Sequence, residues 1–277
     1  MSTRSRRTFQ QLVTLPEGAI PLAEAALLLA CEEYPQLEIG PYVDQLDEIA
    51  GTVRSRIQGT GSPLDIIESI NHVLFDELGF RGNTENYHDP RNSFFNDVLE
   101  RRVGIPITLS TVFLEVARRV SLPVAGVGLP GHFLVKYVDR TQEIYLDPFN
   151  RGEILTQSDC ARRLAEIFGD SQSFSEQMLA PVSSRQMLLR MLNNLKAIYL
   201  KAHTYDKGLG MVDMMLLIEP EDFSQYRDRG VLYVQLRKFD AAVRDFERYL
   251  KGAPDSTDRP QVEEHLKELR RIQAMMN

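Results

Sequence analysis

The stretch NSFFNDVLERRVGIPITLSTVFLEVARRVSLPVAGVGLPGHFLVKY, which runs from Asn92 to Tyr137, decides the fold of this chain. From Leu109 to Val120 its apolar residues recur at i, i+3, i+4, i+7, i+8 and i+11, which is the spacing of one helix face. We therefore expect a helix that follows Gly104-Ile105-Pro106 and is fully embedded along that face.

After Pro123 the period of the apolar residues changes from helical to extended. Three strands are predicted, because three segments rich in branched and aromatic residues are separated by short breaks. They are Val124–Leu129, His132–Val138 and Glu143–Leu146, and a turn at Thr141-Gln142 separates the last two. Neighbouring strands that are joined by short turns pair antiparallel. A small antiparallel sheet is therefore expected after the embedded helix.

Further helices are expected on either side of this segment. A capping serine and a proline in the first turn mark the start of one of them at Ser62-Pro63. By periodicity and caps they cover Ile20–Tyr34, Pro41–Ile57, Pro63–Leu78, Ser93–Arg102 and Ser158–Phe168. Helices come first and a small sheet comes last, so we expect residues 1–180 to form one helix-rich α+β domain.

The composition is that of an ordinary globular protein. Of the 277 residues, 43% are hydrophobic and 26% are charged, and the net charge of −7 gives the chain no electrostatic reason to bind nucleic acid. The most apolar stretch, Ile20–Cys31, is too short to span a bilayer, and no signal peptide is indicated. We expect a cytoplasmic protein without a membrane partner. Cys31 and Cys160 lie in helical patterns without disulfide or zinc spacing, so neither a metal nor another cofactor is expected.

Residues 181–277 repeat with a period of 34 residues, which separates Tyr199 from Tyr233 and Pro220 from Pro254. The second unit has the residue order of a tetratricopeptide (TPR) repeat: Gly230, Tyr233, Ala242, Phe246 and Pro254. The first unit is a weaker copy, because Lys196 stands where a small residue is usual. The final helix, Gln261–Met275, is expected to cap an all-α TPR-like domain.

The opening stretch, together with LDPFN (Leu146–Asn150), resembles the bacterial SirB family over nearly the whole chain. Members of that family resemble transglutaminases in their first two-thirds and carry TPR repeats at the end. The order of buried helix, strand with a leading histidine and strand ending in Asp-Pro is also the layout of the papain-related transglutaminase-like fold. The resemblance implies this fold for the α+β domain, but it implies no established reaction.

In the general transglutaminase pattern, a cysteine at the start of the buried helix acts with a histidine and an aspartate. The resemblance places His132 and Asp147 at the last two positions, whereas the cysteine position falls at Pro106. A proline side chain cannot be a nucleophile, and neither cysteine of the chain lies in a register that could replace it. We therefore expect a remnant catalytic pair in a pseudoenzyme. Asn92 and Asn96 could line a pocket beside His132, or be a helix cap and a surface residue.

Other interpretations of the His132–Asp147 pair remain open. Thr108 or Ser110, one turn inside the helix, could be the nucleophile of an acyl-transfer hydrolase or protease. A metal site could be built from the pair together with His88. The pair could also only brace two strands, because a buried carboxylate and an imidazole satisfy each other's hydrogen bonds.

The TPR register also predicts a partner-binding groove on the inner face of the first helix of each repeat. Its positions are Arg190, Asn193, Ala197, Leu200 and Lys201 in the first repeat and Ser224, Arg227, Val231, Val234 and Gln235 in the second. The basic residues could receive an acidic peptide or a terminal carboxylate. Ala197 and Val231 occupy the asparagine positions of chaperone-binding TPR proteins, so that clamp is not reproduced. The sequence predicts a non-catalytic interaction or scaffold protein, whose groove binds a protein or peptide or is filled by intramolecular docking of the two domains.

Overall fold

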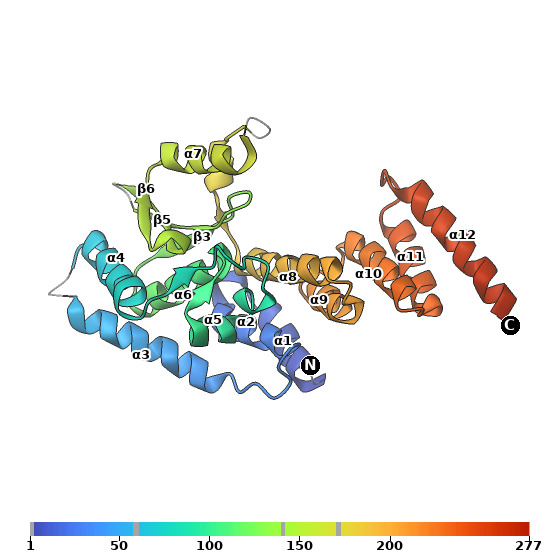
Figure 1. Cartoon of the computed structure of the whole chain (residues 1–277), viewed down its shortest axis with the longest axis horizontal. Helices are drawn as coiled ribbons and strands as arrows, with labels where there is room; N and C mark the ends of the chain where they lie inside the picture. The colour runs from blue at the N-terminus through green and yellow to red at the C-terminus, as the bar shows by residue number, and fades with distance from the viewer. Residues whose placement is uncertain (1–2, 58–60, 140–141, 170–172, 277) are drawn as a thin grey trace. The chain divides into compact units, whose positions relative to one another are not determined.

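The computed structural model describes residues 3–57, 61–139, 142–169 and 173–276 (Figure 1). Contacts within the chain group it into two compact units, residues 1–191 and 192–277. Helix α8 (Ser184–Lys201) begins in the first unit and ends in the second. Thr141, the first residue of the predicted turn at 141–142, lies outside the described residues.

The helices of the first unit confirm those predicted, with bounds that differ by a few residues. Ser62 caps α4, because its hydroxyl accepts a hydrogen bond from the Asp65 amide, and the Asp65 carboxylate accepts one from the Ser62 amide. Sequence analysis missed α1, whose Phe9 and Val13 are buried one turn apart. The helices are α1 (Thr3–Val13), α2 (Leu22–Ala30), α3 (Gly40–Arg56), α4 (Pro63–Asn71, continued by a π-helical segment, His72–Glu77), α5 (Phe95–Arg101), α6 (Pro106–Arg119) and α7 (Gln157–Phe168).

The main sheet of the first unit is antiparallel, has five strands and follows the order β6-β5-β4-β3-β7. The three predicted strands form its centre as β3 (Val124–Val127), β4 (Leu134–Val138) and β5 (Glu143–Asp147). The edge strands β6 (Glu153–Leu155) and β7 (Pro181–Val182) are too short to show a period in the sequence. A separate parallel pair joins β1 (Arg81–Gly82) to β2 (Val103–Gly104).

Helix α6 is buried far beyond the one face that its apolar spacing predicts. The polar residues Thr108, Ser110 and Thr111 are themselves fully buried, as is almost every other residue of the helix. Each of the three hydroxyls donates a hydrogen bond to a backbone carbonyl, which removes the cost of burying it. Helix α6 is therefore the central element of the first unit and packs against β3, β4 and α3.

The second unit is all-helical and is formed by the end of α8 with α9 (Tyr205–Ile218), α10 (Phe223–Gln235), α11 (Phe239–Gly252) and α12 (Arg259–Met276). Its core contains Ala242, Phe246 and Tyr249 of α11. Gly230 lets α10 approach α11 closely, since a Cβ there would lie 2.5 Å from the ring of Phe246. This contact between a small residue and an aromatic ring is what the TPR pattern predicts.

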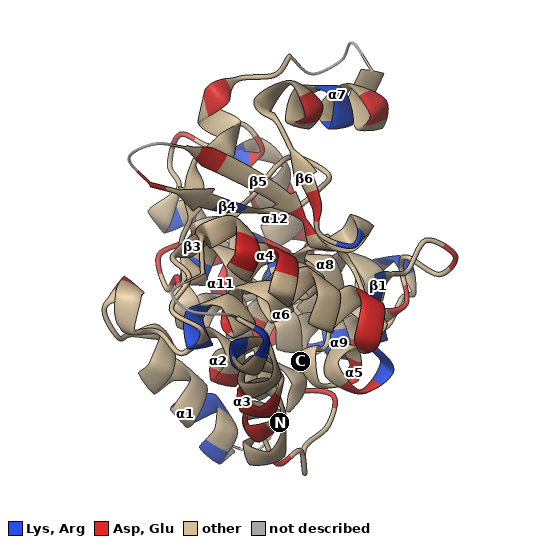
Figure 2. Ribbon diagram, turned by 90° about the vertical axis from the view of Figure 1, so that its left-hand side faces the viewer, with Lys and Arg blue, Asp and Glu red and all other residues tan. Residues whose placement is uncertain are grey.

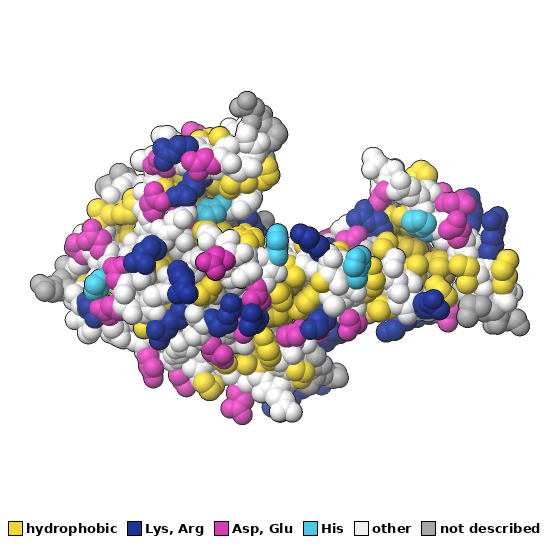
Figure 3. Space-filling view, viewed as in Figure 1, with side chains coloured by type: hydrophobic (Ala, Val, Ile, Leu, Met, Phe, Trp, Pro, Cys, Tyr) yellow, Lys and Arg dark blue, Asp and Glu magenta, His cyan; other side chains and the backbone are white. Residues whose placement is uncertain are grey.

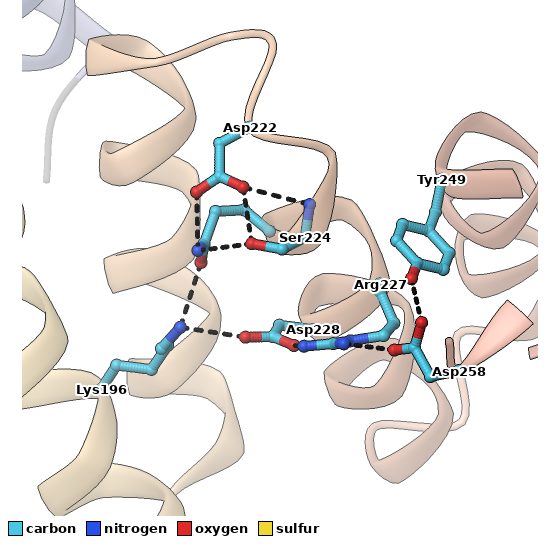
Figure 4. Close-up of polar contacts among 8 residues, drawn as sticks. Lys196, Asp222, Ser224, Arg227, Asp228, Tyr249 and Asp258 are labelled. Atoms are coloured by element: carbon cyan, nitrogen blue, oxygen red, sulfur yellow. Dashed lines mark hydrogen bonds and ion pairs between the residues drawn. The ribbon is translucent and has the colours of Figure 1, made fainter. Parts of the chain in front are cut away.

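An ionic network ties the helices of the second unit together (Figure 4). Lys196, on α8, is buried at the position where a small residue is usual, and its ammonium group lies 3.0 Å from both Gln225 Oε1 and Asp228 Oδ2. Asp228 also pairs with Arg227, which in turn pairs with Asp258. The network explains how the weaker first repeat accommodates a lysine.

Acidic and basic residues are interspersed along α7 of the first unit, whereas on α3 the acidic residues all precede the basic ones (Figure 2). Among the described residues, no helix is both long enough and apolar enough to cross a membrane.

Candidate functional site

Antiparallel pairing places His132 and Asp147 side by side. Since Val135 on β4 is paired with Leu146 on β5, the start of β4 lies beside the end of β5. His132 comes two residues before β4 and not inside the predicted strand, and Asp147 is the last residue of β5. His132 Nε2 lies 2.8 Å from Asp147 Oδ2, and both side chains are buried.

The Asp147 carboxylate is held by several donors and remains ionised. Its oxygens accept hydrogen bonds from the backbone amide and the side chain of Asn150, and Arg163 Nε lies 3.5 Å away. Burial alone would raise the pKa of Asp147, but the hydrogen bond and charge of His132, with Asn150 and Arg163, outweigh it and hold the pKa below its ordinary value. An ionised carboxylate only accepts hydrogen bonds, so Nε2 of His132 carries the proton that this contact shares with Asp147.

The turn that carries His132 is fixed by Arg190 of α8. The Arg190 guanidinium donates to the carbonyls of Leu129 and His132, at 3.0 and 2.6 Å, and lies over the ring of Phe133. Gly131 has a φ of +69°, and a side chain there would approach Ile167 at the end of α7. The position of the imidazole is therefore set by backbone contacts on either side of it.

Aromatic rings line one side of the imidazole. The Phe149 ring stands edge-on to His132 with the ring centres 5.9 Å apart, and Tyr87 contacts Phe149 in turn. Tyr87 belongs to the polar loop before α5 and is 39% exposed. Sequence analysis missed this contact, because nothing in a polar loop indicates which distant ring it covers.

Neither predicted hydroxyl is bonded to His132. Thr108 Oγ1 donates to the Asn92 carbonyl at 2.8 Å, and Ser110 Oγ donates to the Phe133 carbonyl at 3.3 Å. Each hydroxyl has one proton and gives it to a backbone oxygen, so neither is activated by the imidazole.

The two predicted asparagines have different surroundings. Asn92 braces the loop before α5, donating to the carbonyls of Asn86 and Tyr87 and accepting from Asn83. Asn96 is buried, and its Oδ1 has no hydrogen-bond partner among the described residues. No group of three His, Cys, Asp or Glu side chains in the described part of the chain could hold a metal ion, so the alternative site with His88 is not assembled.

Residues 41–193 match the transglutaminase-like superfamily, and residues 195–267 match the tetratricopeptide repeat. The first match covers more than half of the chain. The chain belongs to the transglutaminase-like superfamily.

Relatives of this transglutaminase-like protein cover from about two thirds to nearly all of its length. A UPF0162 protein of Xylella fastidiosa is 35% identical over 266 residues, which are 94% of each chain. A UPF0162 protein of Vibrio cholerae is 32% identical over 189 residues, which are 68% of this chain and 70% of that one. Human F-box only protein 21 is 28% identical over 182 residues, which are 62% of this chain but 28% of that protein.

In this transglutaminase-like unit the first residue of α6 is Pro106, which is buried. The two thiols lie elsewhere: Cys31 follows α2, and Cys160 lies on α7. Both are buried, and burial, followed by the charges of Asp159 and Asp147, raises the pKa of Cys160 to about 11. A thiol with such a pKa is almost entirely protonated at neutral pH and is a poor nucleophile.

The predicted groove positions of the TPR repeats differ in what they offer to a partner. Asn193, Lys201 and Gln235 are exposed. Arg227 is paired with Asp228 and Asp258, and Arg190 holds backbone carbonyls of the first unit. Of the three predicted basic positions, only Lys201 therefore presents an exposed charge without a described ion pair.

Proposed function

We propose that this chain is a non-catalytic protein-interaction protein of the SirB group, in which a transglutaminase-like frame without a nucleophile is joined to a TPR partner-binding domain. The observation that carries the proposal is Pro106 as the first residue of α6. A thiol at the start of a helix is activated by the unpaired amides and the helix dipole, and a proline offers neither a thiol nor an amide proton.

The hydrogen bonds around the pair support the same conclusion. An acyl-transfer hydrolase using Thr108 or Ser110 would need a hydroxyl within hydrogen-bond reach of His132. Both hydroxyls instead donate to carbonyls inside the fold, where they contribute to the packing of α6. The His132–Asp147 pair then acts as a buried brace between the ends of two strands.

The second half of the proposal rests on the repeats, because TPR helices generally mediate protein–protein contacts. Exposed residues lie at the predicted inner positions of both first helices, including Leu200 at 38% and Val231 at 41% exposed. Apolar side chains exposed at these positions are available to a partner that packs in the groove. The division of function after residue 180, the cytoplasmic location and the alternative of intramolecular docking stay predictions.

Capture of partners by the intact chain tests the interaction. Bound proteins from a bacterial extract are compared between the unchanged chain, Leu200→Glu on the groove face and Val138→Glu as a matched control. Val138 is 48% exposed but lies on the sheet of the first unit. We expect Leu200→Glu to lose partners that Val138→Glu retains, and identical partner sets would refute a groove-based role.

Covalent probes test the absence of catalysis. A fluorophosphonate probe and an acyl-donor ester are incubated with the intact chain and with His132→Ala, and labelled peptides are located by mass spectrometry. We expect no labelling at Thr108 or Ser110 above the level of His132→Ala. Labelling of either hydroxyl that depends on His132 would overturn the non-catalytic assignment.

A further inference from the structure

A cavity of about 230 Å³ opens on the second unit between α10, α11 and α12. Phe239 and Phe246 of α11 form part of its lining, and Val231 and Ile272 stand on the two flanking helices. Val231 is 41% exposed and Ile272 is 40% exposed, so the cavity has an apolar border that water reaches. Figure 3 shows hydrophobic side chains gathered over this part of the chain.

The size of the cavity restricts what it can hold. Pockets for cofactors and drug-sized ligands usually measure about 300–1,000 Å³. A cavity of about 230 Å³ has roughly the volume of seven or eight water molecules, which is enough for one bulky side chain and little more. Interfaces concentrate their binding energy on such anchor side chains seated in well-packed pockets.

The polar residues of the lining indicate what should stand next to the anchor. Glu268 is the one acidic residue of the lining, His265 contributes an imidazole, and no lysine or arginine contributes to it. Gln235, a predicted groove residue, also lines the cavity and has an amide that can pair with a peptide backbone. A basic residue beside the apolar anchor would therefore be complementary to this site.

The charges elsewhere on the groove face do not favour the acidic peptide expected from the sequence. The guanidinium group of Arg227 is already paired with two aspartates, and that of Arg190 with two carbonyls. An acidic ligand would have to displace these partners at Arg190 and Arg227 and could meet an exposed cation only at Lys201, whereas an apolar and basic ligand needs none of these cations.

We propose that the second repeat and α12 together form an anchor pocket for a peptide segment of a partner protein, in which a bulky apolar side chain is flanked by a lysine or arginine. The proposal rests on the interaction role proposed above and specifies the partner. Helix α12 is thus part of the binding surface as well as the cap of the array.

A displayed library of random peptides, selected on the intact chain, tests the proposal. We expect enriched peptides to share Leu, Ile, Met, Phe or Trp next to Lys or Arg. One enriched peptide is then synthesised with a fluorophore, and replacing its anchor with alanine should weaken binding about 30-fold, as for a typical hot-spot residue.

Variants of the chain locate the site. Val231→Glu and Ile272→Glu should each abolish binding of the synthetic peptide, while Met275→Glu, at an α12 position that is 84% exposed, should not change it. Glu268→Lys should remove the preference for a basic flank, with a loss of about 2–5-fold, as for an exposed ion pair. Circular dichroism and thermal melting establish whether each variant is folded. If one of the two border variants misfolds, the other still tests the site.

Several outcomes would overturn the anchor pocket. The library could yield no enriched peptides, or enriched peptides without an apolar anchor. Binding of the synthetic peptide could persist in both border variants. The chain could also form a dimer that Val231→Glu dissociates, and the occupant of the pocket would then be a second copy of the chain. If Leu200→Glu abolishes partner capture but Val231→Glu and Ile272→Glu do not, the interaction role stands and the anchor pocket fails. If no groove variant changes capture and His132-dependent labelling is found, the proposed function itself fails.

Discussion

Two Gly→Ala substitutions in the second unit should change stability in opposite directions. A Cβ at Gly230 would lie 2.5 and 2.6 Å from two ring carbons of Phe246, and Phe246 is 1% exposed. Since ordinary carbon contacts begin near 3.4 Å, the ring has to move by about 1 Å. Overpacking of this kind lowers the free energy of unfolding by about 1–3 kcal/mol. Replacing a glycine inside a helix with alanine raises it by up to about 1 kcal/mol. We therefore expect Gly230→Ala to destabilise the unit by up to about 2 kcal/mol.

Gly208 on α9 is the matched control. A Cβ there meets its nearest neighbour, Leu232, at 3.6 Å, which is an ordinary contact. Only the gain in helix propensity remains, so Gly208→Ala should stabilise the unit by about 0.5–1 kcal/mol. Phe246→Leu should reduce the cost of Gly230→Ala, because the smaller side chain leaves room for the added methyl group.

Hydrogen exchange measured by mass spectrometry on the intact chain is the appropriate assay. It reports the free energy of opening of α10 and α11 separately from the first unit. If Gly230→Ala and Gly208→Ala shift the exchange of these helices in the same direction, or if Phe246→Leu leaves the cost of Gly230→Ala unchanged, the assigned contact is wrong.

Three further predictions concern charge and thiol chemistry. In urea denaturation, Asp228→Asn should lower the free energy of unfolding by about 1–2 kcal/mol more than Lys196→Met does, because it leaves a buried ammonium group without its carboxylate. Equal losses of unfolding free energy would contradict the ionic network. Because the pKa of Asp147 is lowered on folding, its contribution to stability is complete above its unfolded pKa of about 3.9 and is lost as the pH falls through the folded value. As the pH is lowered below 4, the urea midpoint of Asp147→Asn should therefore fall less than that of the unchanged chain. Midpoints of the two proteins that change with pH in parallel would refute this prediction. Both cysteines should react with iodoacetamide at neutral pH only after denaturation, since both thiols are buried, and rapid native labelling of Cys160 would contradict its raised pKa.

Local patterns in the sequence predict the backbone frame well. The change of period after Pro123 gives the three central strands, and the Ser62 cap gives the start of α4. The α1 helix was missed because its short apolar pattern lies in a basic segment, and β7 because two residues carry no period. The order and approximate length of the main elements are therefore readable from the sequence alone.

The surroundings of the candidate site could not be predicted in the same way, because they are contacts across the fold. Arg190 fits the TPR groove register, yet the carbonyls that it binds lie about 60 residues earlier in the chain. The position of Arg163 beside Asp147 depends on where α7 packs on the sheet. The turn after β5 is the exception, because an aspartate directly before a proline is a recognisable signal for a side-chain cap, and here Asp147 accepts a hydrogen bond from the Asn150 amide.

If the frame has lost its nucleophile, as we propose, other interactions must hold it in place. Here the imidazole is fixed by the Asp147 carboxylate, and its turn is fixed by the Arg190 guanidinium. Asp147 is fixed in turn by Asn150, and the buried hydroxyls of α6 are satisfied by carbonyls. None of these bonds involves the side chain of Pro106, so the residue at the start of α6 is free to be chosen for helix initiation, which proline favours at the first position. The same bonds explain why the pair remains ordered: removing either partner would leave a buried polar group without a hydrogen bond, whether or not the site performs chemistry.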